Sequence, residues 1–73
     1  MSAHSIATHR IEVELSAIPA SLLPSLTADR ARMAAILAEE LSAITTSERD
    51  SYLKQIRASE AARYVELLPR ATA

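Results

Sequence analysis

The chain has no glycine, cysteine, phenylalanine or tryptophan among its 73 residues. Without cysteine it can form no disulfide, no thiolate metal site and no redox centre. Without glycine it lacks the residue that tight primed hairpin turns and phosphate-binding loops require. This absence argues against a β-rich fold and against a glycine-rich nucleotide site. With two tyrosines as its only aromatic residues, the chain can build little of a concave ligand pocket.

The chain also lacks a large excess of charge of either sign and a long apolar run. Nine acidic and eight basic residues give a net charge of −1, which disfavours non-specific binding to nucleic acid or to an anionic membrane. The longest apolar run, Met33–Ala38, is far too short to span a bilayer, and no secretory signal opens the chain. We therefore expect a cytoplasmic protein without a membrane partner. Seven arginines against one lysine, with abundant alanine, suggest a GC-rich bacterial genome.

The apolar residues that are present are mostly small. Hydrophobic residues make up 49% of the chain, but 15 of them are alanine, and the large apolar set is dominated by nine leucines and six isoleucines. A domain of this size buries only about 60% of the surface that its unfolded chain exposes. We expect the core to be completed by self-association or by a partner chain, in a homodimer or a hetero-complex.

One stretch alternates as a β-strand does. In residues 10–16 the apolar Ile11, Val13 and Leu15 alternate with Glu12 and Glu14. This pattern predicts a short N-terminal strand, or an extended arm, whose free edge pairs with another chain by β-augmentation. Residues 1–9 show no periodicity and are predicted to be a flexible tail, so that residues 10–73 form a single small helical domain.

Two helices are predicted after a connector that contains Pro19 and Pro24. The first runs from about residue 28 to 44, with Thr27 as its N-cap, and the second from about residue 47 to 67, stopped by Pro69. Ser47 followed by Asp50 resembles a capping box for the second helix. The predicted fold class is therefore mainly α: a short strand or arm followed by two helices. The sequence leaves open whether these form a helical hairpin or an extended rod.

The first predicted helix has two faces without charge. At 100° per residue, the large side chains fall on one stripe, typical of a core face: Leu26, Met33, Leu37, Leu41 and Ile44. Small residues fall on the other side, where they would let another helix approach closely: Ala31, Ala35, Ala38 and Ser42. The small-residue face is a candidate partner contact, although alanine also serves simply as the best helix former on an exposed face.

Glu60 is the one charged residue within the apolar stripe of the second predicted helix. It lies four residues from both Ile56 and Tyr64, and Arg57 and Arg63 are close enough to pair with it. Such a carboxylate can set the register against a partner or accept the cation of a partner. The simpler alternative is a rim residue paired with its own arginines.

The sequence offers no constellation for catalysis, metal or cofactor binding. The two histidines, His4 and His9, fall in the predicted tail with too few companion ligands for a metal site. The serines have no ordered histidine to activate them, and Glu39 and Glu40 are adjacent, so they point away from each other on a helix. We expect a non-enzymatic protein without cofactor.

Two classes of function are favoured, and a third, an inhibitor of an enzyme or a phage-type decoy, stays open. The first is a protein–protein interaction module (an adaptor, accessory subunit or assembly component). Its partner-binding residues are in the edge strand, on the small-residue face and at one carboxylate: Ile11, Val13, Leu15, Ala31, Ala35, Ala38, Ser42 and Glu60. The second is a dimeric DNA-binding regulator or antitoxin, because the predicted order of strand, helix, turn and helix resembles the ribbon-helix-helix architecture. Acidic Glu12 and Glu14 on the predicted ribbon count against DNA binding.

Overall fold

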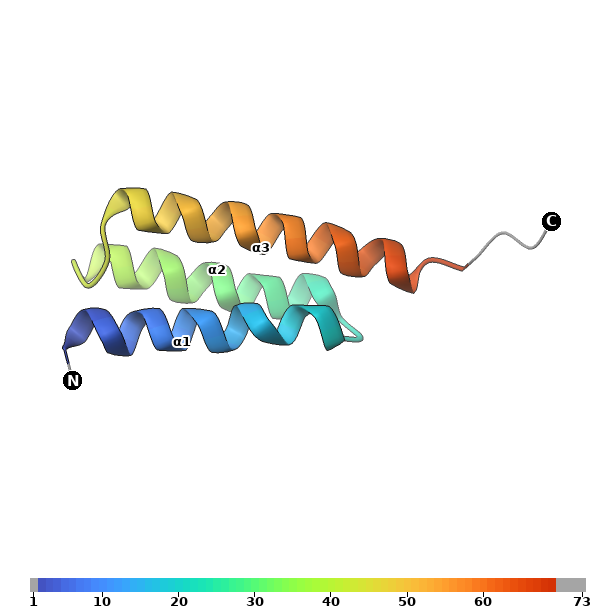
Figure 1. The fold of residues 1–73 in the computed structure, drawn as a ribbon, viewed down its shortest axis with the longest axis horizontal. Helices are drawn as coiled ribbons and strands as arrows, with labels where there is room; N and C mark the ends of the chain where they lie inside the picture. The colour runs from blue at the N-terminus through green and yellow to red at the C-terminus, as the bar shows by residue number, and fades with distance from the viewer. Residues whose placement is uncertain (1, 70–73) are drawn as a thin grey trace.

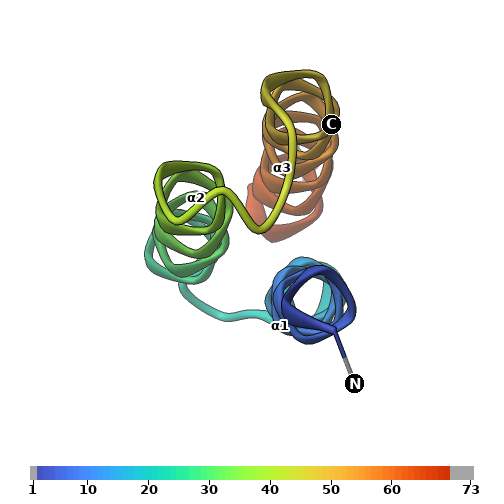
Figure 2. The same ribbon diagram turned by 90° about the vertical axis from the view of Figure 1, so that its left-hand side faces the viewer.

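The computed structural model describes residues 2–69, which form a compact all-α arrangement of three helices. The elements are α1 (Ala3–Ala17), a short 3₁₀ turn η1 (Ile18–Ala20), α2 (Pro24–Glu40) and α3 (Thr46–Leu67). The helices run side by side, each antiparallel to the next along the chain (Figure 1). Viewed from the end, they lie at the corners of a triangle (Figure 2). Each helix therefore packs against the other two and keeps one outer face.

The predicted strand at residues 10–16 is wrong, because these residues form the second half of α1, and residues 2–69 contain no strand. The alternation of apolar residues spans only three positions and competes with a longer helical pattern. Ala7, Ile11, Leu15 and Ile18 recur at spacings of three and four, which places them on one side of a helix. Ile11 and Ile18 are fully buried, whereas Val13 is exposed.

The predicted tail also lies largely within α1, which starts at Ala3. Ser2 is the N-cap, and its hydroxyl accepts a hydrogen bond from the backbone N–H of Ser5 at 3.0 Å. No glycine or proline interrupts residues 3–17, so once this cap is formed nothing in the sequence ends the helix before Pro19. Of the predicted tail, only residue 1 lies outside the described residues.

The helix predicted at residues 28–44 exists, but it begins and ends four residues earlier. Pro24 occupies its first turn, where its missing N–H and fixed φ are favourable, so Thr27 lies inside the helix instead of capping it. At the other end the chain leaves the helix after Glu40 through Ser42, which has a φ of 60°. The Ser42 N–H binds the Glu39 carbonyl at 2.9 Å and the Ala43 N–H binds the Ala38 carbonyl at 2.8 Å. This is a Schellman cap with serine in the place usually taken by glycine.

The second predicted helix is confirmed as α3, including its end at Leu67. Its capping box is earlier than predicted: Thr45 is the N-cap, and Glu48 accepts a hydrogen bond from the Thr45 backbone N–H at 2.9 Å. The short turn between residues 41 and 45 folds α3 back along α2, so the two form a hairpin and not a rod (Figure 1).

The core is built from alanine on α2 and isoleucine on its neighbours. Ile11 packs with Ala35, Ala38 and Ile44 in one cluster, and a second cluster continues the core along the bundle: Ile18, Ala28, Ala31 and Ile56. Small side chains on α2 let α1 and α3 approach it closely on the same side. The only large side chains buried completely among residues 2–69 are three isoleucines, at positions 11, 18 and 56, so the core is thin.

Candidate functional site

The small-residue face of α2 is occupied within the chain. Ala31 and Ala35 are fully buried and Ala38 is nearly so, all three between α2 and the helices that flank it. Close helix approach at these alanines, expected from the sequence, therefore takes place inside the three-helix bundle. Ser42, the fourth member of the predicted face, is exposed in the turn after α2.

The large-residue stripe of α2, interpreted from the sequence as the core face, lies on the outside instead, except for Ile44, which follows the helix and is buried in the core. Six large apolar residues of α1 and α2 keep between 45% and 70% of their surface exposed: Ile6, Val13, Leu26, Met33, Leu37 and Leu41. We call these six residues the α1–α2 face. Three of them, Ile6, Leu37 and Leu41, line one groove. Monomeric proteins rarely expose large contiguous apolar patches, and such patches mark interaction sites.

An apolar groove of about 450 Å³ runs along this face between α1 and α2. Ala3 and Ala7 of α1, with Ala34 and Ala38 of α2, line it with small side chains, and each pair is spaced by four residues. Larger side chains complete the lining: Ile6, Arg10, Leu37 and Leu41, together with Ala43. Arg10 forms a salt bridge with Glu14 at 3.2 Å. A floor of alanines between aliphatic ridges is the shape that admits another helix.

The three apolar residues of the predicted strand, Ile11, Val13 and Leu15, do not share one face of α1. Ile11 is in the core and Leu15 packs partly buried against the second core cluster, so neither is available to a partner in the folded chain. Val13 alone is exposed and belongs to the α1–α2 face. The helical period, which places residues 11 and 13 about 200° apart, explains the separation.

Glu60 is bound within the chain, by an arginine that the sequence did not indicate. Its carboxylate pairs with Arg32 of α2, which also binds Asp29 at 2.8 Å. The hydrogen bond from Arg32 to Glu60 is the main reason that the pKa of Arg32 is raised. Arg63, predicted as a partner of Glu60, donates instead to the Ser21 carbonyl at 2.8 Å. Glu60 thus sets the register of α3 against α2 inside the bundle.

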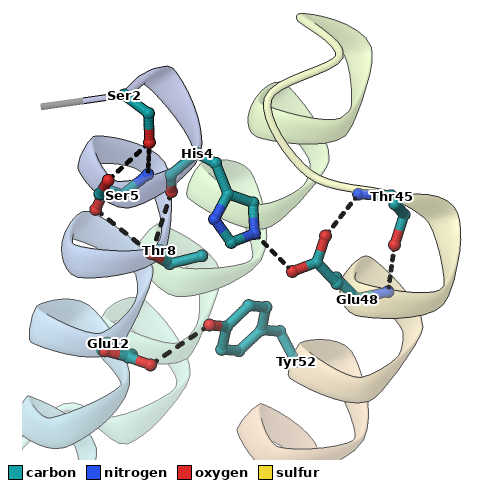
Figure 3. Close-up of polar contacts among 8 residues, drawn as sticks. All are labelled: Ser2, His4, Ser5, Thr8, Glu12, Thr45, Glu48 and Tyr52. Carbon is teal, nitrogen blue, oxygen red and sulfur yellow. Dashed lines mark hydrogen bonds and ion pairs between the residues drawn. The ribbon is translucent and has the colours of Figure 1, made fainter.

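A second polar cluster joins the N-terminal ends of α1 and α3 (Figure 3). His4 lies 2.6 Å from the carboxylate of Glu48, and the Tyr52 hydroxyl donates to Glu12 at 3.3 Å. The hydrogen bond with His4, followed by that from the Thr45 backbone, lowers the pKa of Glu48. Burial, followed by the Glu12 carboxylate, raises the pKa of Tyr52. These groups are directed at one another and at the α3 cap, so the cluster fastens α1 to α3.

Metal binding and membrane insertion find no support in the described part of the chain. Residues 2–69 hold no group of three or more histidine and acidic side chains arranged to bind a metal ion. Over the same residues, the helices are too short or too polar to cross a membrane.

The signal for the α1–α2 face is present in the sequence, but it is ambiguous. A helix with alanine on one side and leucine on the other can bury either side. A three-helix bundle with few large apolar residues gains close packing by burying the alanines. On α1, Ala3, Ile6 and Ala7 repeat at spacings of three and four, a helical pattern within the segment predicted to be a tail.

Comparison with models of protein families, with curated proteins and with solved structures finds no match to this chain. The function must therefore be inferred from the surface of the molecule.

Proposed function

We propose that this chain is a cytoplasmic, non-enzymatic protein–protein interaction module that docks through the α1–α2 face. The observation that carries the proposal is the position of the leucine stripe: Leu26, Met33, Leu37 and Leu41 are more than half exposed, while the alanine side of the same helix is buried. Covering one large aliphatic side chain stabilises by about 1.5–3 kcal/mol when burial is complete. A face with several of them favours association with another apolar surface.

The outer side of α3 supports the proposal by contrast. From residue 46 to residue 62 its exposed positions are charged, polar or small, including Lys54, Arg57 and Ala61, which is the composition of a solvated helix surface. Exposed large apolar residues of α3 occur only near its C-terminal end: Tyr64, Val65 and Leu67. Most of the length of α3 therefore lacks the exposed large apolar residues that α1 and α2 carry, and such an exposed apolar group is typical of an interaction surface. A second exposed apolar group lies between the start of α2 and the C-terminal end of α3, at Leu22, Leu23, Tyr64, Leu67 and Leu68.

The alternative of a ribbon-helix-helix regulator loses its main support. That architecture reads DNA with a two-stranded ribbon, and the residues that would supply the ribbon, 10–16, form part of α1. The net charge of −1 adds no phosphate-binding surplus.

The proposal can be tested by site-specific photo-crosslinking in the native cells. A photoreactive amino acid is placed at Leu37 on the α1–α2 face, and at Val65 on α3 as the control, because Val65 is also apolar and is 68% exposed. The proposal expects protein adducts from position 37 that are absent or much weaker from position 65. Equal adduct yields from the two positions would contradict it.

A further inference from the structure

We infer that the occupant of the α1–α2 face is a second copy of this chain, docked face to face about a two-fold axis. This inference rests on the proposed function and names its partner. In such an assembly α1 and α2 of both copies form a four-helix core, and each α3 lies outside it. The first support is shape, since a two-fold interface requires a surface that fits itself.

The α1–α2 face has both halves of a self-complementary surface. Leu37 and Leu41 form a ridge on α2, and the alanines of the groove form the depression beside it. Ridges of one helix pack into the grooves between residues of another when the helices approach to about 8–10 Å. Ala34 and Ala38 on the groove floor permit that approach because their side chains end at Cβ. In a two-fold contact each copy supplies one ridge and receives the other.

The second support is area. Burying a large aliphatic side chain removes on the order of 100–150 Å² from water. With 45–70% of each still exposed, the six residues of the face and the groove alanines offer on the order of 500 Å² of apolar surface per copy. A standard interface buries about 800 Å² per partner, of which roughly 60% is apolar, or again about 500 Å². The exposed face therefore matches the size of one stable dimer interface.

The third support is charge. Arg10 at the groove is neutralised by Glu14. The charged residues at helical spacing with the leucine stripe are of both signs: Asp29, Arg30 and Glu40. The long aliphatic stem of Arg30 lets its charged group lie at the rim of an interface. The face thus carries no strong field of one sign, so contact with a copy of itself meets little repulsion. A partner recognised by charge would require a cluster of charged residues of one sign on this surface.

The test measures the mass of the purified chain by sedimentation equilibrium across roughly a hundredfold concentration range centred near micromolar values. The inference expects the mass to rise from that of one chain, 7.9 kDa, to that of two. Leu37→Glu places a charge in the apolar contact and should raise the midpoint of association at least about tenfold. Val65→Glu, on the outer side of α3, should leave the midpoint unchanged. Circular dichroism checks that both variants keep their helicity.

Either of two results would overturn the inference. One is a wild-type chain that stays monomeric at every concentration, and the other is a Leu37→Glu variant that associates as the wild type does. If wild type is monomeric while position 37 still crosslinks to a different protein in cells, self-association is wrong and the proposed function stands. In that case another protein is the occupant.

A cysteine variant keeps the inference testable if Leu37→Glu does not fold. The chain contains no cysteine, so Leu37→Cys and Val65→Cys each introduce one thiol. With a flexible bis-maleimide, which joins thiols that are close but not in contact, the inference expects Leu37→Cys to form a covalent dimer at least about tenfold faster than Val65→Cys, because association raises the effective concentration of its thiols. Equal rates for the two variants would overturn it.

Discussion

The guanidinium of Arg32 on α2 binds the carboxylate of Glu60 on α3, and both side chains are half-buried between the two helices. Arg32 also holds Asp29 of its own helix, so one cation joins two carboxylates. A second bridge of the same kind, from Arg49 to Glu39 at 3.0 Å, lies nearer the turn between the helices. The α2–α3 contact is therefore aligned by ion pairs on one side of a thin alanine core.

Glu60→Ala removes one of the two carboxylates that Arg32 binds and leaves Arg32 partly buried with Asp29 alone. Because the pair is neither fully exposed nor fully buried, we expect the free energy of unfolding to fall by about 1–2 kcal/mol. Urea denaturation measures it. Glu66→Ala, at an exposed position on the same helix, should change it by less than about 0.5 kcal/mol. In an Arg32→Ala background the effect of Glu60→Ala should shrink, and an undiminished effect would show that the two side chains do not interact.

Sequence reasoning succeeded for the extent of α3. It failed for the buried side of α2, and it failed at residues 10–16, where a strand pattern and a helix pattern competed. The capping sequence before α3 and Pro69 after it mark the two ends of a long polar helix, and both signals act locally. The segment at residues 10–16 offered three alternating positions, too few to decide between strand and helix without the residues before and after them. Which side of α2 is buried is a property of the whole bundle, since it depends on how closely three helices approach one another.

A pair of substitutions distinguishes a helix from a strand at residues 10–16 in solution. In the helix Ile11 is fully buried and Val13 is 45% exposed, whereas a strand would place both on one face. We expect Ile11→Ala to lower the free energy of unfolding by about 2–5 kcal/mol, because it opens a cavity in a small core. Val13→Ala should cost less than about 1 kcal/mol. Thermal denaturation followed by circular dichroism checks both, and similar losses at the two positions would contradict the helical assignment.

The fully buried Ala35 tests which side of α2 faces inward. Ala35→Leu inserts a larger side chain between α2 and the helices packed on it, so we expect overpacking to lower the free energy of unfolding by about 1–3 kcal/mol. Ala62→Leu, at an exposed position on α3, is the matched control and should be nearly neutral. Chemical denaturation of the two variants measures the difference. If Ala35→Leu left stability unchanged, the alanine side of α2 would have to be free in solution.

The lowered pKa of the Glu48 carboxylate predicts how the stability of the fold depends on pH. Hydrogen bonds from His4 and the Thr45 backbone lower its pKa below the ordinary value of 4.5 in the folded chain. The folded state therefore favours the ionised form, and this contribution is present above about pH 4.5 and is lost as the pH falls through the lower folded value. Glu48→Gln should thus reduce stability, measured by urea denaturation, more at pH 7 than at pH 3. Glu66→Gln is the control, and a Glu48→Gln effect that is the same at both pH values would contradict the assignment.

Ser42 is the place where the missing glycine has a measurable consequence. Its φ of 60° lies in the left-handed region, which costs a residue with a Cβ about 1 kcal/mol and costs glycine little. The two Schellman hydrogen bonds at this turn use only backbone groups, so they survive the loss of the side chain. We expect Ser42→Gly to raise the free energy of unfolding by about 0.5–1 kcal/mol, whereas Ser51→Gly within α3 should lower it by a similar amount. Urea denaturation of the two variants measures both signs, and a loss of stability on Ser42→Gly would mean that this turn does not adopt the left-handed cap in solution.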